Sequence, residues 1–148
     1  MESTVNLSTR IAKEHDKKYF FDLYCDSMKA HIESLWGWDQ DWQVSDSEDR
    51  WNFSVNYILF NAEKRIGYFQ VTEEKDGAYI MMFIIDKKFR SKGIGSHALT
   101  ILKKLLLNKS LSLRVFKTNT RALSFYKDNG FSIIEQEDKF YIMHQRVA

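Results

Sequence analysis

A cluster of glycines and cations follows the most apolar stretch of the chain, in the run Arg90-Ser91-Lys92-Gly93-Ile94-Gly95-Ser96. We expect a helix to begin within this run, and the first amides of a helix lack internal partners and lie at the positive end of its dipole. Glycines at 93 and 95 let an anion approach the backbone closely, and Arg90 and Lys92 add positive charge. The run therefore predicts a binding site for an anion such as a diphosphate.

Common nucleotide-binding patterns account for these glycines less well. Residues 93–98 match the dinucleotide pattern G-x-G-x-x-A, but they come too late in the chain to start a doubly wound nucleotide-binding fold. The strand expected at 110–116 is also followed by Lys117-Thr118-Asn119, without an acid for a ribose. The phosphate-binding pattern G-x-x-x-x-G-K-[ST] is absent. A purely structural turn would leave the two cations without a role.

The charges are segregated along the chain although the net charge is only +2. Residues 87–127 contain eleven Lys or Arg and no Asp or Glu, whereas residues 33–49 contain six acids and no Lys or Arg. Opposed runs of this kind predict that one part of the protein meets a polyanion and another part a cation. Solvated helix faces can produce the same pattern.

The elements that must position these residues follow from the apolar periodicity. With 148 residues and 44% hydrophobic residues, the chain is expected to form one domain, residues 1–148. The order is predicted as β-α-α-β-β-β-α-β-α-β-β, with Thr120 as the N-cap of the last helix and Asn129-Gly130 as its C-terminal stop. The predicted strands cover 7–11, 53–60, 65–72, 78–85, 110–116, 131–136 and 139–144, and the helices with clear periodicity cover 16–35, 93–108 and 121–128.

Composition also limits the compartment and the cofactors. A single cysteine, Cys25, cannot form an internal disulfide, which favours a reducing cytoplasm. The longest apolar run, 78–85, is far shorter than the ~20 residues of a membrane helix, and the first four residues resemble no secretory signal. We expect a cytoplasmic protein with no membrane partner. The four histidines share no ligand spacing, so no metal is expected.

The glycine run belongs to a larger pattern. It follows the apolar strand 78–85 and precedes a strand, Asn119, and a helix that carries Tyr126 and ends in Asn129-Gly130-Phe131. In this combination the chain resembles the GNAT superfamily of N-acetyltransferases, most strongly from Ala78 to Phe131, and residues 31–39 resemble the first-helix region of a bacterial subgroup. The resemblance implies an α/β fold whose mixed central sheet is mostly antiparallel, with one parallel, splayed strand pair and helices on both faces.

The resemblance also implies where acetyl-CoA, the acetyl donor, would bind. It would lie between strands 78–85 and 110–116, with its pantetheine arm on the backbone of Phe83, Ile84 and Ile85 and on the side chain of Asn119. Tyr126 would point toward the sulfur, and Lys92 or Lys127 would help to neutralise the pyrophosphate. The amides expected to hold the pyrophosphate are those of Arg90, Ser91, Lys92, Gly93, Ile94, Gly95 and Ser96.

Acetyl transfer to an amine requires three functions. Tyr126, a phenol with an ordinary pKa of ~10, can give a proton to the leaving thiolate. A backbone N–H of strand 78–85 can stabilise the oxyanion. The base is less defined, because Tyr79 stands where some family members have a strand carboxylate; a water held by backbone carbonyls or Glu33 are the alternatives.

The acceptor side is expected in the acidic, Trp-rich segment after the first helix. Trp36, Trp38 and Trp42 are expected to wall the pocket, and Asp39 and Asp41 to attract a cationic amine of a small molecule or peptide. Glu33 and Tyr79 are also expected to contact the acceptor. The alternative is that these tryptophans form a small core under the first helix.

Two other functions were compared with the sequence, and one of them stays open. The missing strand carboxylate also suits a non-catalytic acyl-CoA-binding or regulatory module. Nucleic-acid binding is not expected, because the basic stretch lacks the clustered aromatics used to stack bases. The sequence leaves open whether the protein forms a homodimer.

Overall fold

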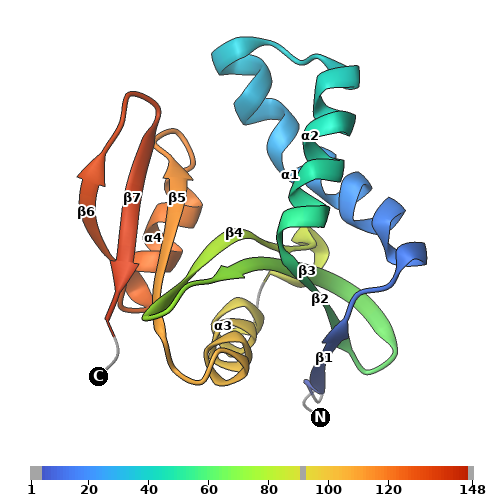
Figure 1. The fold of residues 1–148 in the computed structure, drawn as a ribbon, viewed down its shortest axis with the longest axis vertical. Coiled ribbons are helices and arrows are strands. Elements are labelled where there is room, and N and C mark those ends of the chain that lie inside the picture. Colours follow the sequence, from blue (N-terminus) through green and yellow to red (C-terminus); the bar gives the residue numbers. More distant parts are fainter. Residues whose placement is uncertain (1–4, 91–92, 147–148) are drawn as a thin grey trace.

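One seven-stranded sheet with the order β1-β2-β3-β4-β5-β7-β6 forms the centre of the protein (Figure 1). The computed structural model describes residues 5–90 and 93–146. The elements are β1 (Leu7–Ile11), α1 (Lys17–Trp36), α2 (Gln40–Phe53), β2 (Val55–Asn61), β3 (Lys64–Glu73), β4 (Gly77–Ile85), α3 (Ile94–Leu105), β5 (Ser110–Phe116), α4 (Thr120–Asp128), β6 (Ser132–Gln136) and β7 (Phe140–Gln145), with short 3-10 turns at Glu14–Asp16 and Lys87–Phe89.

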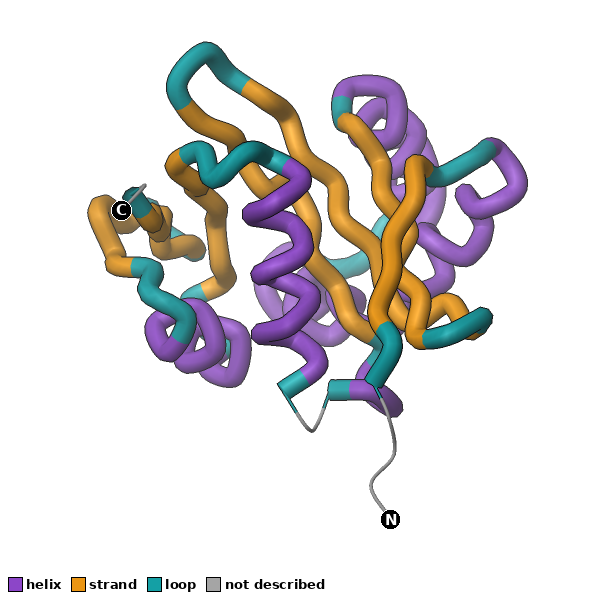
Figure 2. The backbone as a smooth tube through the Cα atoms, turned by 90° about the horizontal axis from the view of Figure 1, so that it is seen from below, coloured by secondary structure: helices purple, strands orange, loops and turns teal. Residues whose placement is uncertain are grey.

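Two hydrophobic cores cover the two faces of the sheet. On one face, α3 and α4 pack through side chains such as Leu99 and Tyr126. Figure 2, seen from below, shows α3 running across this face. On the other face, α1 packs Phe20 and Tyr24 against Tyr68 and Ile84. The predicted fold, a mixed and mostly antiparallel sheet with helices on both faces, is confirmed.

The sheet opens into a fork between β4 and β5. These strands form the one parallel pair among the described residues, and their register runs only from Gly77 opposite Ser110 to Ile80 opposite Leu113. Beyond that point β4 continues along β3, and β5 continues along β7 (Figure 1). The β3–β4 register also skips Met81, which has no partner residue on β3. The predicted splayed pair is therefore confirmed, and Met81 lies at its branch point.

Some predicted element boundaries are wrong. Phe53 is the last residue of α2 rather than the first of a strand, and α3 ends at Leu105 instead of Asn108. The N-cap of α4 is Asn119, whose Oδ1 accepts from the Ala122 amide at 3.2 Å, and Thr120 is the first helical residue. Both residue types can cap a helix, and the turn at the end of β5, closed by Asn119 N–H to Phe116 O at 2.9 Å, selects Asn119.

Asp16 ties the start of α1 to the sheet. Its carboxylate is fully buried and accepts from Arg10 Nη1 at 2.9 Å, Arg65 Nη1 at 3.3 Å and the Lys13 amide at 2.8 Å. Burial alone would raise the pKa of Asp16, but the hydrogen bonds from Arg10 and Lys13 outweigh it and hold this pKa below its ordinary value. The carboxylate is therefore a charged anchor that joins β1, β3 and α1.

Two further predictions concern membranes and metals. Over residues 5–90 and 93–146, no helix has both the length and the apolar character needed to cross a bilayer. The same residues place no three His, Cys, Asp or Glu side chains together for a metal ion. Cys25 is half-buried beside the α1 core, and its pKa is raised by burial and, less strongly, by Asp22.

Candidate active site

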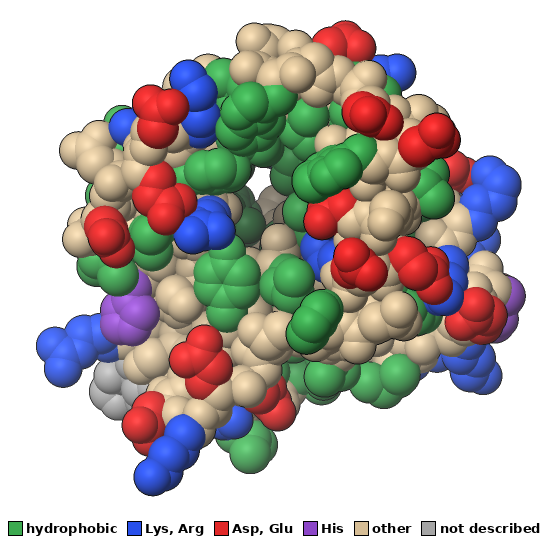
Figure 3. Space-filling view, turned by 45° about the horizontal axis from the view of Figure 1, so that its top comes forward, with side chains coloured by type: hydrophobic (Ala, Val, Ile, Leu, Met, Phe, Trp, Pro, Cys, Tyr) green, Lys and Arg blue, Asp and Glu red, His purple; other side chains and the backbone are tan. Residues whose placement is uncertain are grey.

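A cavity of about 1000 Å³ lies in the fork between β4 and β5. It extends into the space between the helices α1 and α2 on one side and the strands β5 and β7 on the other. Figure 3 shows the hollow on this side of the molecule, ringed by hydrophobic side chains and flanked by acidic ones. After the ligands predicted from the sequence, we call the part lined by β4, α3 and α4 the cofactor half, and the part lined by α1, α2, β5 and β7 the acceptor half.

The glycine turn forms the floor of the cofactor half. Gly93 caps α3 with φ +74°, a left-handed conformation that glycine adopts without strain. Gly95 lies in the first turn, where a Cβ would come within 2.9 Å of the Phe125 ring. The absence of this Cβ lets α4 approach α3 and leaves the amide end of α3 open to the cavity. Ser91 and Lys92, both predicted here, lie outside the described residues.

Arg90 closes the base of the fork. Its Nε donates to Ile85 O at 2.7 Å and its Nη2 to Ser27 Oγ at 3.1 Å, which joins the end of β4 to α1. Burial, and then the nearby Arg121 guanidinium, lower the pKa of Arg90 below its ordinary value. Two guanidiniums thus stand near the amide end of α3, a favourable setting for a polyanion.

The structure brings most of the predicted cofactor residues together around one space. The predicted residues that line the cavity are Phe83, Ile84, Ile85, Arg90, Gly93, Gly95, Ser96, Asn119 and Tyr126. The side chain of Ile94, a residue predicted here for its backbone amide, packs in the core, and Lys127 is exposed and lies outside the lining. The position of Lys127 follows from the orientation of α4, because the helix face with Arg121, Ala122 and Phe125 lines the cavity and Lys127 is not on that face.

Tyr126 is buried at the edge of the fork. Its ring contacts those of Phe83, Phe125 and Phe131 at centroid distances of 6.5, 5.2 and 5.4 Å. Burial raises the pKa of Tyr126 strongly, although Arg121 acts in the opposite direction. The phenol is therefore protonated at neutral pH and can act as a proton donor.

The branch point of β4 supplies backbone groups to the cavity. Met81 has no partner on β3 and lies beyond the last residue pair with β5. Tyr79, two residues earlier, also lines the cavity, and burial raises the pKa of Tyr79 against the opposing effect of Arg114. Tyr79 is thus a neutral phenol at neutral pH, and β4 presents no carboxylate to the cavity.

One face of α2 forms a wall of the acceptor half. The spacing of three, four or seven residues puts Trp42, Asp46, Asp49, Arg50 and Phe53 on that face. Arg50 Nη1 donates to Asp46 Oδ2 at 2.8 Å, and the guanidinium lies 4.6 Å from the centre of the Tyr24 ring. Of these residues, only Trp42 and the two acids of the acidic run were indicated by the sequence.

An aromatic cluster faces α2 across the cavity. Trp36 from the end of α1 lies 5.9 Å from the Phe116 ring and 6.2 Å from the Phe140 ring, and it is 58% exposed. His31 stacks on Phe116 at 5.8 Å and contacts Thr118 Oγ1 through Nδ1 at 3.3 Å. The predicted position of Trp36 beside a pocket agrees with this geometry.

Several predicted acceptor residues lie elsewhere. Glu33 is exposed and outside the cavity lining, because α1 turns Ile32 inward and Glu33 away. Trp38 packs against the α1 core, and its Nε1 donates to Gln40 Oε1 at 2.8 Å, as in the alternative of a small core under the helix. Asp39 caps α2 by accepting from the Trp42 amide at 3.1 Å. The geometry gives these three residues no contact with the cavity, so we do not retain Glu33 as the base.

Family comparison agrees with the fold. The model of the acetyltransferase (GNAT) family matches residues 13–131, and the chain therefore belongs to this family. The predicted resemblance is confirmed at this level, whereas the bacterial subgroup stays a prediction. A comparison with curated protein sequences gives no match.

Solved structures share the fold over nearly the whole chain. The PaiA N-acetyltransferase of Thermoplasma acidophilum, solved in complex with coenzyme A, is 16% identical with a TM-score of 0.77 and covers 95% of this chain and 99% of its own. An acetyltransferase of Thermus thermophilus is 17% identical, with a TM-score of 0.76 and coverage of 95% and 97%. The ribosomal-protein alanine N-acetyltransferase of Escherichia coli is 17% identical, with a TM-score of 0.67 and coverage of 97% and 95%.

Proposed function

We propose that the protein transfers the acetyl group of acetyl-CoA to a primary amine by direct attack within a ternary complex. The observation that carries the proposal is the fork between β4 and β5, which opens one cavity to a cationic, glycine-lined end and to a separate acidic and aromatic end. Two substrates can therefore reach one point from opposite sides without a covalent enzyme intermediate.

The residues of the cofactor half fit acetyl-CoA. Beyond Ile80, β4 has lost its pairing with β5, so a pantetheine arm can occupy the place of a strand there. The amide end of α3 with Arg90 and Arg121 suits the pyrophosphate. Asn119 uses Oδ1 as a helix cap, which leaves its amide NH2 to donate to the arm. Acetyl-CoA supplies the acetyl group as a reactive thioester.

The protein's own groups complete the transfer. The neutral amine forms a C–N bond to the acetyl carbon while the C–S bond breaks, and the products are an amide and a thiol. The backbone N–H of Met81, which has no partner residue on β3, would stabilise the negative charge that develops on the acetyl oxygen. Tyr126 gives its proton to the leaving sulfur and regains one through solvent from the amine.

The proton of the ammonium needs an acceptor other than Glu33 or a strand carboxylate. Tyr79 is unsuitable as a base because burial raises its pKa and keeps it protonated. We propose that water held by backbone carbonyls at the fork receives this proton, since β4 and β5 both leave carbonyls unpaired where they diverge.

A second candidate function is a non-catalytic acyl-CoA-binding module. The absence of Asp and Glu from residues 77–85 is the observation that favours it. Both candidates predict binding of acetyl-CoA, and only the first predicts turnover.

The test combines calorimetry with a thiol-release assay. We expect saturable heat with acetyl-CoA, and thiol release when primary amines are added. Heat without thiol release across cationic and neutral amines would favour the binding module. The absence of heat at millimolar acetyl-CoA would reject both functions.

A further inference from the structure

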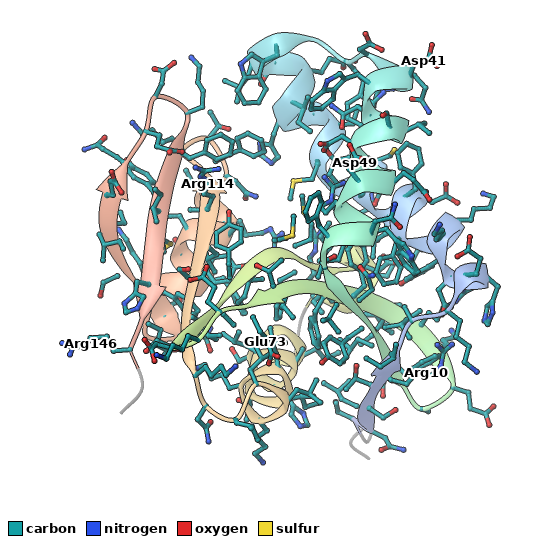
Figure 4. All side chains as sticks on the ribbon, viewed as in Figure 1. Arg10, Asp41, Asp49, Glu73, Arg114 and Arg146 are labelled. Atoms are coloured by element: carbon teal, nitrogen blue, oxygen red, sulfur yellow. The ribbon has the colours of Figure 1, made fainter. Side chains whose placement is uncertain are left out.

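Asp49 stands out among the charged groups of the acceptor half. It lines the cavity from the middle of the α2 face. Within residues 5–90 and 93–146 its carboxylate has no hydrogen bond and no ion pair. Figure 4 shows Asp49 on α2 and Arg114 on β5 at opposite walls of the cavity. Asp49 thus brings an uncompensated negative charge to a ligand site.

The cations of the acceptor half are already paired. Arg50 donates to Asp46 at 2.8 Å, and Arg114 donates to Glu137 Oε2 at 3.0 Å. The remaining guanidiniums that line the cavity, Arg90 and Arg121, belong to the cofactor half. The acceptor half therefore keeps the charge of Asp49 unless a ligand neutralises it.

Aromatic surfaces flank this carboxylate. Phe53 lies one helical turn after Asp49 on the same face and is 80% exposed, and Trp42 lies two turns before it and is 59% exposed. The faces of such rings attract ammonium groups. A carboxylate between exposed aromatic rings suits an organic cation better than a hydrated inorganic ion.

The chemistry of the reaction limits which cation Asp49 can bind. The amine that attacks the thioester must be neutral, so it cannot be the group that Asp49 binds in the reactive complex. We propose, on the basis of the proposed function, that the acceptor carries a second positive charge remote from the reacting amine, and that Asp49 binds it and determines specificity. The substrate class is a diamine, or a primary amine linked to another basic group.

The test compares straight-chain α,ω-diamines with monoalkylamines of the same length in the thiol-release assay. We expect kcat/KM to be about 5- to 10-fold higher for the best diamine, the range of a cation bound by a carboxylate and aromatic faces. Asp49→Asn should lower kcat/KM for the diamine more than for the monoalkylamine and so reduce this preference to below about twofold. Asp41→Asn, on the same helix but outside the cavity lining, should keep the full preference.

The outcomes separate this inference from the proposed function. Equal rates for diamines and monoalkylamines, or an equal loss of both rates in Asp49→Asn, would overturn the inference and leave the acetyltransferase intact. Acetyl-CoA calorimetry on Asp49→Asn reports whether the variant has kept its fold and cofactor half. Absence of both thiol release and acetyl-CoA heat in the wild type would overturn the two together.

Discussion

The two halves of the cavity are built from different materials. The cofactor half depends on backbone: the amides at the start of α3, the unpaired edge of β4 and the space left by Gly95. The acceptor half depends on side chains presented by α1, α2 and β7, and its rings at Trp36, Trp42 and Phe53 are largely exposed. A site made of backbone is constrained by the fold, whereas a site made of exposed side chains can differ in specificity on the same fold.

The largest expected effect comes from Tyr126, where the two halves meet. Tyr126→Phe should lower kcat by about 100-fold and leave acetyl-CoA affinity unchanged, because only proton donation to the leaving thiolate is lost. Since burial raises the pKa of Tyr126, the wild-type rate should show no loss from phenol ionisation up to about pH 10. Steady-state kinetics across pH would measure both effects. Tyr57→Phe, outside the cavity lining, is the matched control, and equal rates for the two variants would exclude this role.

The next effect concerns Asp16, which anchors the start of α1, one of the helices that line the acceptor half. Asp16→Asn should lower the free energy of unfolding at pH 7 by about 2 kcal/mol, because a buried carboxylate loses charge-assisted hydrogen bonds. The pKa of Asp16 is lower in the folded state, so its contribution is complete above the unfolded pKa of ~3.9 and is lost as the pH falls through the folded pKa.

Denaturant unfolding at pH 7 and pH 3 would check this linkage. The wild type should lose more stability on acidification than Asp16→Asn. As a control, Asp22→Asn removes an exposed pair with Lys18 and should cost less than about 0.5 kcal/mol. If the free energy of unfolding of Asp16→Asn fell as steeply with acidification as that of the wild type, the prediction would be wrong.

A pair of glycine variants would sharpen the contrast between the halves. Gly95→Ala should weaken acetyl-CoA binding about tenfold, because the new methyl group displaces the Phe125 ring at the cavity floor. Gly37→Ala, with φ +81° and open space around it at the end of α1, should lower stability by about 1 kcal/mol and leave acetyl-CoA affinity unchanged. Calorimetry and thermal unfolding separate the two results, and similar affinities for the two variants would contradict the distinction.

The smallest effect concerns the aromatic cluster of Trp36, Phe116 and Phe140. Trp36→Ala should raise KM for the amine about threefold without changing KM for acetyl-CoA, since an exposed ring contributes under ~1 kcal/mol. Two-substrate kinetics would detect this split. A parallel rise of both KM values would show that the halves are not independent at this position.

Local signals made the cofactor half predictable from sequence. Gly93 and Gly95, the buried strand before them and the Asn129-Gly130 stop each act within a few residues, and the structure has them at the expected ends of α3, β4 and α4. The choice between Asn119 and Thr120 as N-cap was not local, since it depends on how β5 ends. The inward position of Arg121 rather than Lys127 depends on the docking of α4 on the sheet.

The acceptor half was less predictable because its composition does not fix which helix face turns inward. The acidic run was visible, but Glu33 and Asp39 are two of its six acids and neither lines the cavity, whereas Asp46 and Asp49 do. The spacing of Trp42, Asp46, Asp49 and Phe53 contains this information once α2 is known to extend to Phe53. An apolar-periodicity search misses it, because the face that lines the cavity is partly charged.

The short pairing between β4 and β5 has a consequence for ligand-linked stability. Residues 81–85 show no partner on the β5 side, so the sheet contains an internal seam that an extended ligand arm can close with backbone hydrogen bonds. Under the proposed function, acetyl-CoA would raise the melting temperature by mass action and slow hydrogen exchange selectively at the β4 amides. The thioester would then act as a missing strand that joins the N-terminal and C-terminal portions of the protein.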